Sequence, residues 1–138
     1  MIIDGTDLIL GRLGTVVAKK ALLGEKIDIV NCEKIVITGD KKVILARFKQ
    51  KKDMGAPLVG PYFPRLVDRL VRRSIRGMLP YKKGKGKDAF TNIMCYIGVP
   101  EEFKGKKLDT IKEANISKLP NLKYIRMGEV SRFLGMKI

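Results

Sequence analysis

The apolar positions at the start of the chain predict a strand followed by a helix. Met1–Asp4 is apolar enough for a short strand, and Leu10, Leu13 and Val17 then fall on one face of a helix. Polar residues occupy the opposite face, and Gly24 is a suitable helix stop. A strand followed by an amphipathic helix is the first half of a βαβ unit.

The next stretch, "KIDIVNCEKIVITGD", is dense in β-branched residues. It predicts two short buried strands separated by a turn at Asn31–Lys34. Near the end of the chain, "KYIRM" predicts a last strand and "GEVSRFLG" a short closing helix. We therefore expect residues 1–138 to form one α/β domain with several parallel strands and helices on both faces of the sheet.

The middle of the chain predicts two further helices joined by a loop. Lys41–Lys52 reads as a helix with Val43, Ile44 and Phe48 facing inward. The segment 53–64 is rich in Gly and Pro and should be a loop. Pro64 suits the first turn of the next helix, which we expect to run to residue 76.

A turn and a basic loop are predicted after that helix, at "LPYKKGKGK". Because its lysines alternate with glycines, we expect this loop to be flexible and disordered in the free protein. Asp88 then caps a short helix that should extend to about Met94. "MCYIGVP" predicts one more strand.

Charge is distributed unevenly along the chain, whose formal net charge is +15 with a pI near 10.0. Residues 1–40 carry 5 basic and 6 acidic side chains, residues 41–87 carry 15 and 2, and residues 88–138 carry 9 and 6. A small protein this basic usually has a polyanionic partner. The excess in the middle third predicts that residues 41–87 form the binding surface.

An arginine-rich helix face is the strongest candidate within this region. On a helical projection five arginines fall within an arc of about 100°, opposite an apolar stripe. They are Arg65, Arg69, Arg72, Arg73 and Arg76. A charged face that is merely solvated usually mixes positive and negative residues, whereas this face is all arginine and has one acidic residue, Asp68, at its edge. Since the planar guanidinium binds phosphate oxygens through two parallel hydrogen bonds, the face favours nucleic acid.

Eight further basic residues complete the predicted RNA-binding set. They are Arg47, Lys49, Lys51 and Lys52 at the end of the second helix and Lys82, Lys83, Lys85 and Lys87 in the basic loop. The first four also suit the dipole at a helix C-terminus, which is their alternative role. Tyr62, Phe63 and Tyr81 could stack on bases, and packing is the alternative for each.

Catalytic and metal-binding functions are disfavoured by what the sequence lacks. There is no histidine, the usual general base near neutral pH and the commonest metal ligand. Cys32 and Cys95 have no metal-site or redox spacing and are interpreted as reduced core residues. We predict no cofactor, no metal and no small-molecule substrate.

Membrane and secretion signals are also missing from the sequence. No apolar run approaches the roughly 20 residues that cross a bilayer. "MIIDGTDLIL" lacks the basic region of a signal peptide. We expect a cytoplasmic protein without a membrane partner.

Four stretches in order resemble one family, the universal large-subunit ribosomal protein thirteen. They are "LGRLGTVVAKKALLGEKIDIVNCEKIVITG", "RSIRGMLPYKKGKGKDAF", "YIGVP" and "YIRMGEVSRFLG", and the matches run from Ile3 to Gly135. The chain is similar to archaeal members, because it lacks the C-terminal extension of eukaryotic members and the histidine-serine-glycine stretch of bacterial ones.

The resemblance implies a three-layer α/β/α fold with a small, mostly parallel, four-stranded sheet and a protruding basic helix-loop region. It implies a structural constituent of the large ribosomal subunit, without catalysis, that binds and braces ribosomal RNA and touches neighbouring ribosomal proteins. This function agrees with the charge distribution.

Three other functions stay open at this point. The same basic face could bind messenger RNA in a regulatory role away from the ribosome. An enzyme could use "GRLG" as a phosphate-binding turn, although the full G-x-G-x-x-G pattern is absent. Membrane-surface binding is the weakest alternative, since the apolar face of the basic helix has no large aromatic residue.

Overall fold

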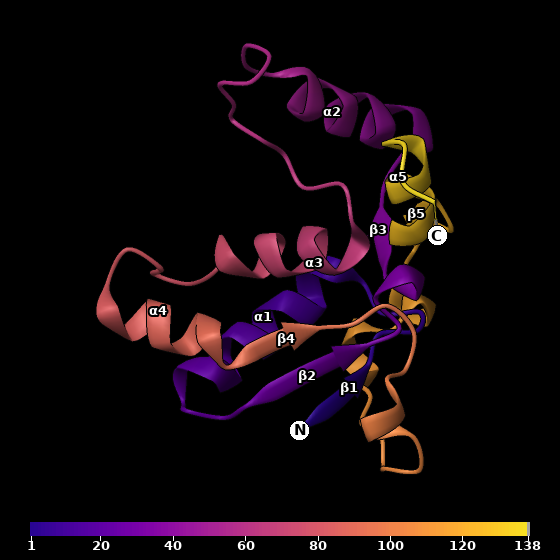
Figure 1. The fold of residues 1–138 in the computed structure, drawn as a ribbon. Coiled ribbons are helices and arrows are strands. Elements are labelled where there is room, and N and C mark those ends of the chain that lie inside the picture. The colour runs from indigo at the N-terminus through magenta and orange to yellow at the C-terminus, as the bar shows by residue number, and fades with distance from the viewer. Residues whose placement is uncertain (138) are drawn as a thin grey trace.

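The computed structural model describes residues 1–137, which alternate between short strands and helices (Figure 1). The strands are β1 (Ile2–Asp4), β2 (Ile27–Val30), β3 (Val36–Thr38), β4 (Ile93–Cys95) and β5 (Tyr124–Arg126). The α-helices are α1 (Leu10–Leu22), α2 (Lys41–Asp53), α3 (Val67–Arg76), α4 (Gly84–Thr91) and α5 (Met127–Phe133). Short 3₁₀ turns lie at Cys32–Lys34, Glu101–Phe103, Lys112–Ala114 and Ile116–Lys118. The predicted α/β class is confirmed.

A three-stranded parallel sheet forms the centre of the fold, in the order β1-β2-β4. Ile3 pairs with Ile29, and Ile29 pairs with Cys95 on its other side. The predicted βαβ unit is therefore present, with α1 as the crossover between β1 and β2. Leu10, Leu13 and Val17 are buried, as their spacing predicts.

The remaining strands differ from the expected single sheet of four, because β3 and β5 form a separate antiparallel pair. The cause lies in the turn after β2. Asn31 adopts a left-handed conformation (φ 55°), and the 3₁₀ turn at Cys32–Lys34 then redirects the chain. Asparagine tolerates this conformation better than most residues. As a result β3 leaves the parallel sheet and pairs with the C-terminal strand.

The main core lies on one face of the parallel sheet. Ile27, Ile29 and Ile93 point to this face and are fully buried. Helix α1 packs there against α3, α4 and β2, and α3 and α4 both contact β4. Asp28 and Met94 point to the other face, where Asp28 is half-buried and Met94 is exposed. Among the described residues the helices thus cover one face of this sheet, while α2 and α5 accompany the antiparallel pair.

Helix α2 projects from the body as an arm and is followed by a long loop that returns to α3 (Figure 1). Ile44 is its one buried residue. Leu45 and Phe48 are half-buried, whereas Val43, expected to face inward, is 57% exposed. The reason is that α2 packs on α5 over only a short contact, which leaves room for few apolar side chains. The protruding basic region implied by the resemblance is present.

The expected flexible loop at "KKGKGK" is instead a turn followed by the start of α4. Lys85 and Lys87 lie in this helix, which begins at Gly84. Gly86 is buried, and a Cβ at this position would collide with the carbonyl group of Pro80. This glycine therefore allows a close approach between α4 and the preceding turn, and the glycines do not loosen the chain here. Helix α4 ends at Thr91, earlier than predicted, and β4 follows directly.

Candidate nucleic-acid interface

Helix α3 places the predicted arginines along one open groove. Its apolar residues Val67, Leu70, Val71 and Ile75 are buried against the core, so its other face is directed outward. The groove has a volume of about 510 Å³, and all five predicted arginines line it, namely Arg65, Arg69, Arg72, Arg73 and Arg76. The predicted clustering of these side chains is therefore confirmed.

Arg65 reaches the groove from outside the helix, because α3 begins at Val67 rather than at residue 65. Leu66 still has an extended conformation (φ −72°, ψ 141°). The carbonyl oxygen of Arg65 accepts a hydrogen bond of 2.6 Å from the buried hydroxyl of Ser131 on α5. The backbone at Arg65 is thereby fixed to α5, while its side chain remains exposed.

Arg72 has structural contacts that the sequence did not predict. Its Nε donates to the carbonyl oxygen of Ile93 at 2.9 Å, and its terminal nitrogen donates to that of Phe90 at 3.2 Å. Its guanidinium carbon also lies 4.0 Å from the centre of the Phe90 ring. No sequence periodicity links residues this far apart, so reasoning from the sequence missed Phe90. Binding of RNA by Arg72 stays a prediction.

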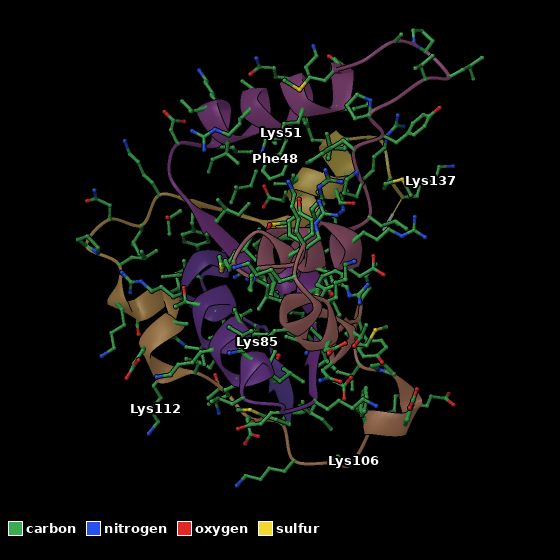
Figure 2. The ribbon with its side chains drawn as sticks, turned by 90° about the vertical axis from the view of Figure 1, so that its left-hand side faces the viewer. Phe48, Lys51, Lys85, Lys106, Lys112 and Lys137 are labelled. Atoms are coloured by element: carbon green, nitrogen blue, oxygen red, sulfur yellow. The ribbon has the colours of Figure 1, made fainter. Side chains whose placement is uncertain are left out.

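A second groove of about 370 Å³ lies between the arm and α3. Phe48 and Phe63 line it with ring centres 6.1 Å apart, and the Lys51 ammonium lies 5.8 Å from each ring. Figure 2 shows Phe48 and Lys51 extending from α2 toward the body. Arg73 and Arg76 line both grooves, so the two are continuous along α3.

The other predicted basic residues spread beyond the grooves. Arg47 and Lys49 are exposed on α2, and Lys52 is half-buried there. Lys82, Lys83, Lys85 and Lys87 are all exposed on the turn and the first part of α4. Figure 2 shows Lys51 on the arm and Lys85 lower down on the same side of the molecule. The basic surface therefore extends from α2 across α3 to α4.

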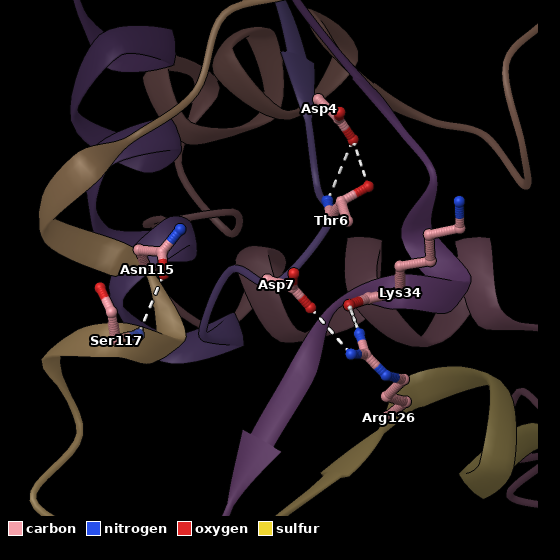
Figure 3. Close-up of polar contacts among 7 residues, drawn as sticks. All are labelled: Asp4, Thr6, Asp7, Lys34, Asn115, Ser117 and Arg126. Carbon is pink, nitrogen blue, oxygen red and sulfur yellow. Dashed lines mark hydrogen bonds and ion pairs between the residues drawn. The ribbon is translucent and has the colours of Figure 1, made fainter.

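None of the thirteen predicted basic residues forms a salt bridge within residues 1–137. The two salt bridges found there join Lys41 to Glu129 at 3.2 Å and Arg126 to Asp7 at 2.8 Å. Figure 3 shows the second pair, in which Arg126 also donates to the carbonyl oxygen of Lys34. Arg126 thus fastens β5 to the β1–α1 turn. The positive charge of the basic surface is left without acidic partners.

The carboxylate of Asp4, near that turn, is structural. It accepts hydrogen bonds from the Thr6 hydroxyl and backbone and from the Asn31 amide. Burial raises the pKa of Asp4, but these hydrogen bonds outweigh burial and hold its pKa below the ordinary value. Figure 3 shows the bonds between Asp4 and Thr6.

The "GRLG" stretch also has a packing role. It lies inside α1, and its second glycine, Gly14, is buried at a position where a Cβ would approach the Met78 sulfur to 2.8 Å. Within the described chain, no cluster of three metal-ligating side chains is found. No helix there is long and apolar enough to cross a membrane.

Comparison with known proteins identifies the family. The sequence pattern described as "Ribosomal protein L13" matches residues 1–102. The large ribosomal subunit protein uL13 of Archaeoglobus fulgidus is 45% identical over 99% of this chain and 88% of its own length. The uL13 protein of Methanosarcina barkeri is 46% identical over 99% of this chain and 98% of its own length. The uL13 protein of Natronomonas pharaonis is 39% identical over 100% of this chain and 92% of its own length. With its α/β fold, its arginine-lined groove and this similarity over nearly the whole length, the chain belongs to the ribosomal protein L13 family.

Proposed function

We propose that this chain is a structural, non-enzymatic constituent of the large ribosomal subunit in the cytoplasm, where its basic surface binds and braces ribosomal RNA. One observation carries the proposal for the surface: five arginines line a single open groove, and no acidic residue pairs with them in the described part of the chain. The relatives are named as proteins of the large subunit, which supports the same role here.

The arginine groove suits a phosphate backbone. Arg69 and Arg73 are exposed, so their guanidiniums are free to form paired hydrogen bonds to phosphate oxygens. Each phosphate they neutralise releases counterions, which makes binding strong at low salt and weaker as salt rises. Recognition should follow the shape of folded RNA rather than a linear sequence of bases.

Bracing follows from the separation of the basic elements. The arm α2, helix α3 and helix α4 present cations from different parts of the fold, and the core holds α3 and α4 in fixed positions. An RNA that contacts all three is held at two fixed elements, α3 and α4, and at the arm that projects beside them. Neighbouring ribosomal proteins are the other partners expected for a constituent of the subunit.

Sedimentation of cell lysate tests the proposal. The full-length chain, tagged at its C-terminus, should co-sediment with the large subunit at about one copy per particle after a moderate-salt wash. A triple variant with Arg69, Arg73 and Arg76 replaced by Gln should move toward the light fractions. The matched control replaces Lys104, Lys106 and Lys107 by Gln, which removes the same number of positive charges from exposed positions outside both grooves. A wild-type chain that stays in the light fractions would contradict the assignment.

A regulatory role on messenger RNA would use the same surface, and RNA footprinting distinguishes the two roles. Protection confined to ribosomal RNA fragments supports the structural role alone. Protection of a messenger leader by the free protein, lost in the triple arginine variant, would add the regulatory role.

A further inference from the structure

The groove between α2 and α3 brings aromatic rings and cationic side chains together. Its aromatic and apolar lining residues are Phe48, Phe63, Leu70 and Tyr81, and charged side chains lie among them. Its volume of about 370 Å³ falls in the range of small-ligand sites, roughly 300–1,000 Å³. Phe48 and Phe63 are only half-buried and Tyr81 is 37% exposed, so their rings are accessible to a planar ligand.

Cations surround these rings at short distances. The Lys51 ammonium lies 5.8 Å from the centres of both phenylalanine rings, and the Arg73 guanidinium carbon lies 5.7 Å from the centre of Phe63. The Arg76 guanidinium carbon lies 4.7 Å from the centre of the Tyr81 ring. In the described chain none of these three cations has a salt-bridge partner, so all remain available to an anionic ligand.

This combination identifies the class of ligand by its chemistry. A nucleobase has flat π-faces that stack on aromatic rings and guanidinium planes, and it is attached to a phosphate that pairs with cations. A bare anion would leave the aromatic rings unused, and an acyl chain would leave the cations unused. A base that is paired inside a duplex cannot expose its faces, so the ligand has to be unpaired.

We propose that the groove between α2 and α3 receives one unpaired base of the bound RNA, which contacts both Phe48 and Tyr81 beside Phe63. This inference rests on the proposed function, because the same RNA occupies the adjoining arginine groove. Phe63, Arg73 and Arg76 line both grooves. A backbone that follows the arginines therefore passes the opening into which a bulged nucleotide would turn.

Two RNA hairpins test the inference with the full-length protein. One is fully paired, and the other carries a single unpaired adenosine in the middle of the same stem. The wild-type protein should bind the bulged hairpin roughly 5- to 140-fold more tightly, which is the range of measured base–aromatic stacking. Tyr81→Leu and Phe48→Leu should each reduce this preference and leave affinity for the paired hairpin nearly unchanged, since they remove no charge.

The control is Tyr124→Leu. Tyr124 is half-buried with the Arg126 guanidinium carbon 6.0 Å from its ring centre, but it lies on β5 outside both grooves. This variant should retain the full preference for the bulged hairpin. Circular dichroism spectra should match the wild type for every variant compared.

Three outcomes are distinguishable. A bulge preference that Tyr81→Leu and Phe48→Leu weaken and Tyr124→Leu keeps supports the inference. Equal affinity of the wild type for both hairpins, or a preference unaffected by both groove variants, overturns it while RNA binding stands. Failure of the wild type to bind either hairpin at low salt overturns the proposed RNA-binding surface and, with it, this inference.

Discussion

The guanidinium of Arg72 stacks on the ring of Phe90, with its carbon 4.0 Å from the ring centre, and donates a hydrogen bond to the carbonyl oxygen of the same residue. A further hydrogen bond reaches Ile93 at the start of β4. One side chain therefore joins α3 to both α4 and β4. Among the five groove arginines, Arg72 is the one whose guanidinium is held by hydrogen bonds within the described chain.

Replacing Arg72 by Gln should lower the free energy of unfolding by about 2–3 kcal/mol, because two charged hydrogen bonds and a cation–π contact are lost. Arg69→Gln, which removes an exposed arginine from the same groove, should change it by less than about 0.5 kcal/mol. Urea denaturation of both variants measures the difference. Equal stabilities would contradict a structural role for Arg72.

RNA affinity should become less dependent on salt when three arginines are removed from the arginine groove. Each phosphate contact contributes about 0.7–0.9 to the slope of log affinity against log salt concentration. The triple replacement of Arg69, Arg73 and Arg76 by Gln should therefore reduce the slope by about 2–3. Titrations of a large-subunit RNA fragment at several salt concentrations provide the measurement. An unchanged slope would remove these arginines from the RNA contact.

Gly86→Ala should destabilise the protein by roughly 1–3 kcal/mol, because the added methyl group collides with the Pro80 carbonyl and displaces α4. Gly84→Ala is the matched control, since a Cβ added at this glycine would meet no atom within 4 Å. Gly84→Ala should leave the free energy of unfolding unchanged or raise it by up to about 1 kcal/mol. Thermal unfolding followed by circular dichroism compares the two.

The lowered pKa of Asp4 predicts a loss of stability in acid. Its hydrogen bonds favour the charged carboxylate, so the stabilisation is complete above the ordinary value of 3.8 and is lost as the pH falls through the lower folded value. Asp4→Asn should therefore be less stable than the wild type near neutral pH, with a gap that narrows below pH 3.8. Urea denaturation across this range tests the sign. A gap that widened in acid would contradict it.

The two cysteines should be protected from thiol reagents in the folded protein. Both are buried, and the pKa of the Cys32 thiol is raised by its hydrogen-bonded neighbour Cys95 and by burial. Since the thiolate is the reactive form, modification should require unfolding. A water-soluble disulfide reagent should modify both thiols in denaturant and neither under native conditions. Rapid modification of the native chain would contradict this burial.

Local patterns predicted the elements well where one face of an element meets the core. The spacing of Leu13 and Val17 identified α1, and the arginine side of α3 followed from the same reasoning. Long-range pairing was harder to foresee, because which strand joins which sheet depends on the turn at Asn31. The sequence predicted that Gly86 makes its loop flexible, and this prediction was wrong for a similar reason. Only the position of the Pro80 carbonyl shows that a glycine is needed there for close packing of α4.

The candidate site shows the same division. Charge counting located the basic surface, but it could not distinguish the structural role of Arg72 from the exposed position of Arg69. That difference depends on contacts of Arg72 with Phe90 and with the backbone of β4. Nor could it indicate that Phe48 lies close to Phe63, since this depends on how the loop between α2 and α3 folds back against the arm. These relations belong to tertiary structure and have no signature in local spacing.

The sparse packing of the α2 arm has a consequence for how this part of the fold is maintained. With only Ile44 buried, few apolar contacts oppose local opening of the helix, and the unpaired cations of α2 and α3 repel one another across the groove. A polyanion bound between α2 and α3 would offset this repulsion and would supply contacts that the few buried side chains of α2 do not provide. Backbone amides of α2 should then exchange with deuterium much more slowly in the RNA-bound protein than in the free one, so that assembly completes a structure that folding leaves loosely held.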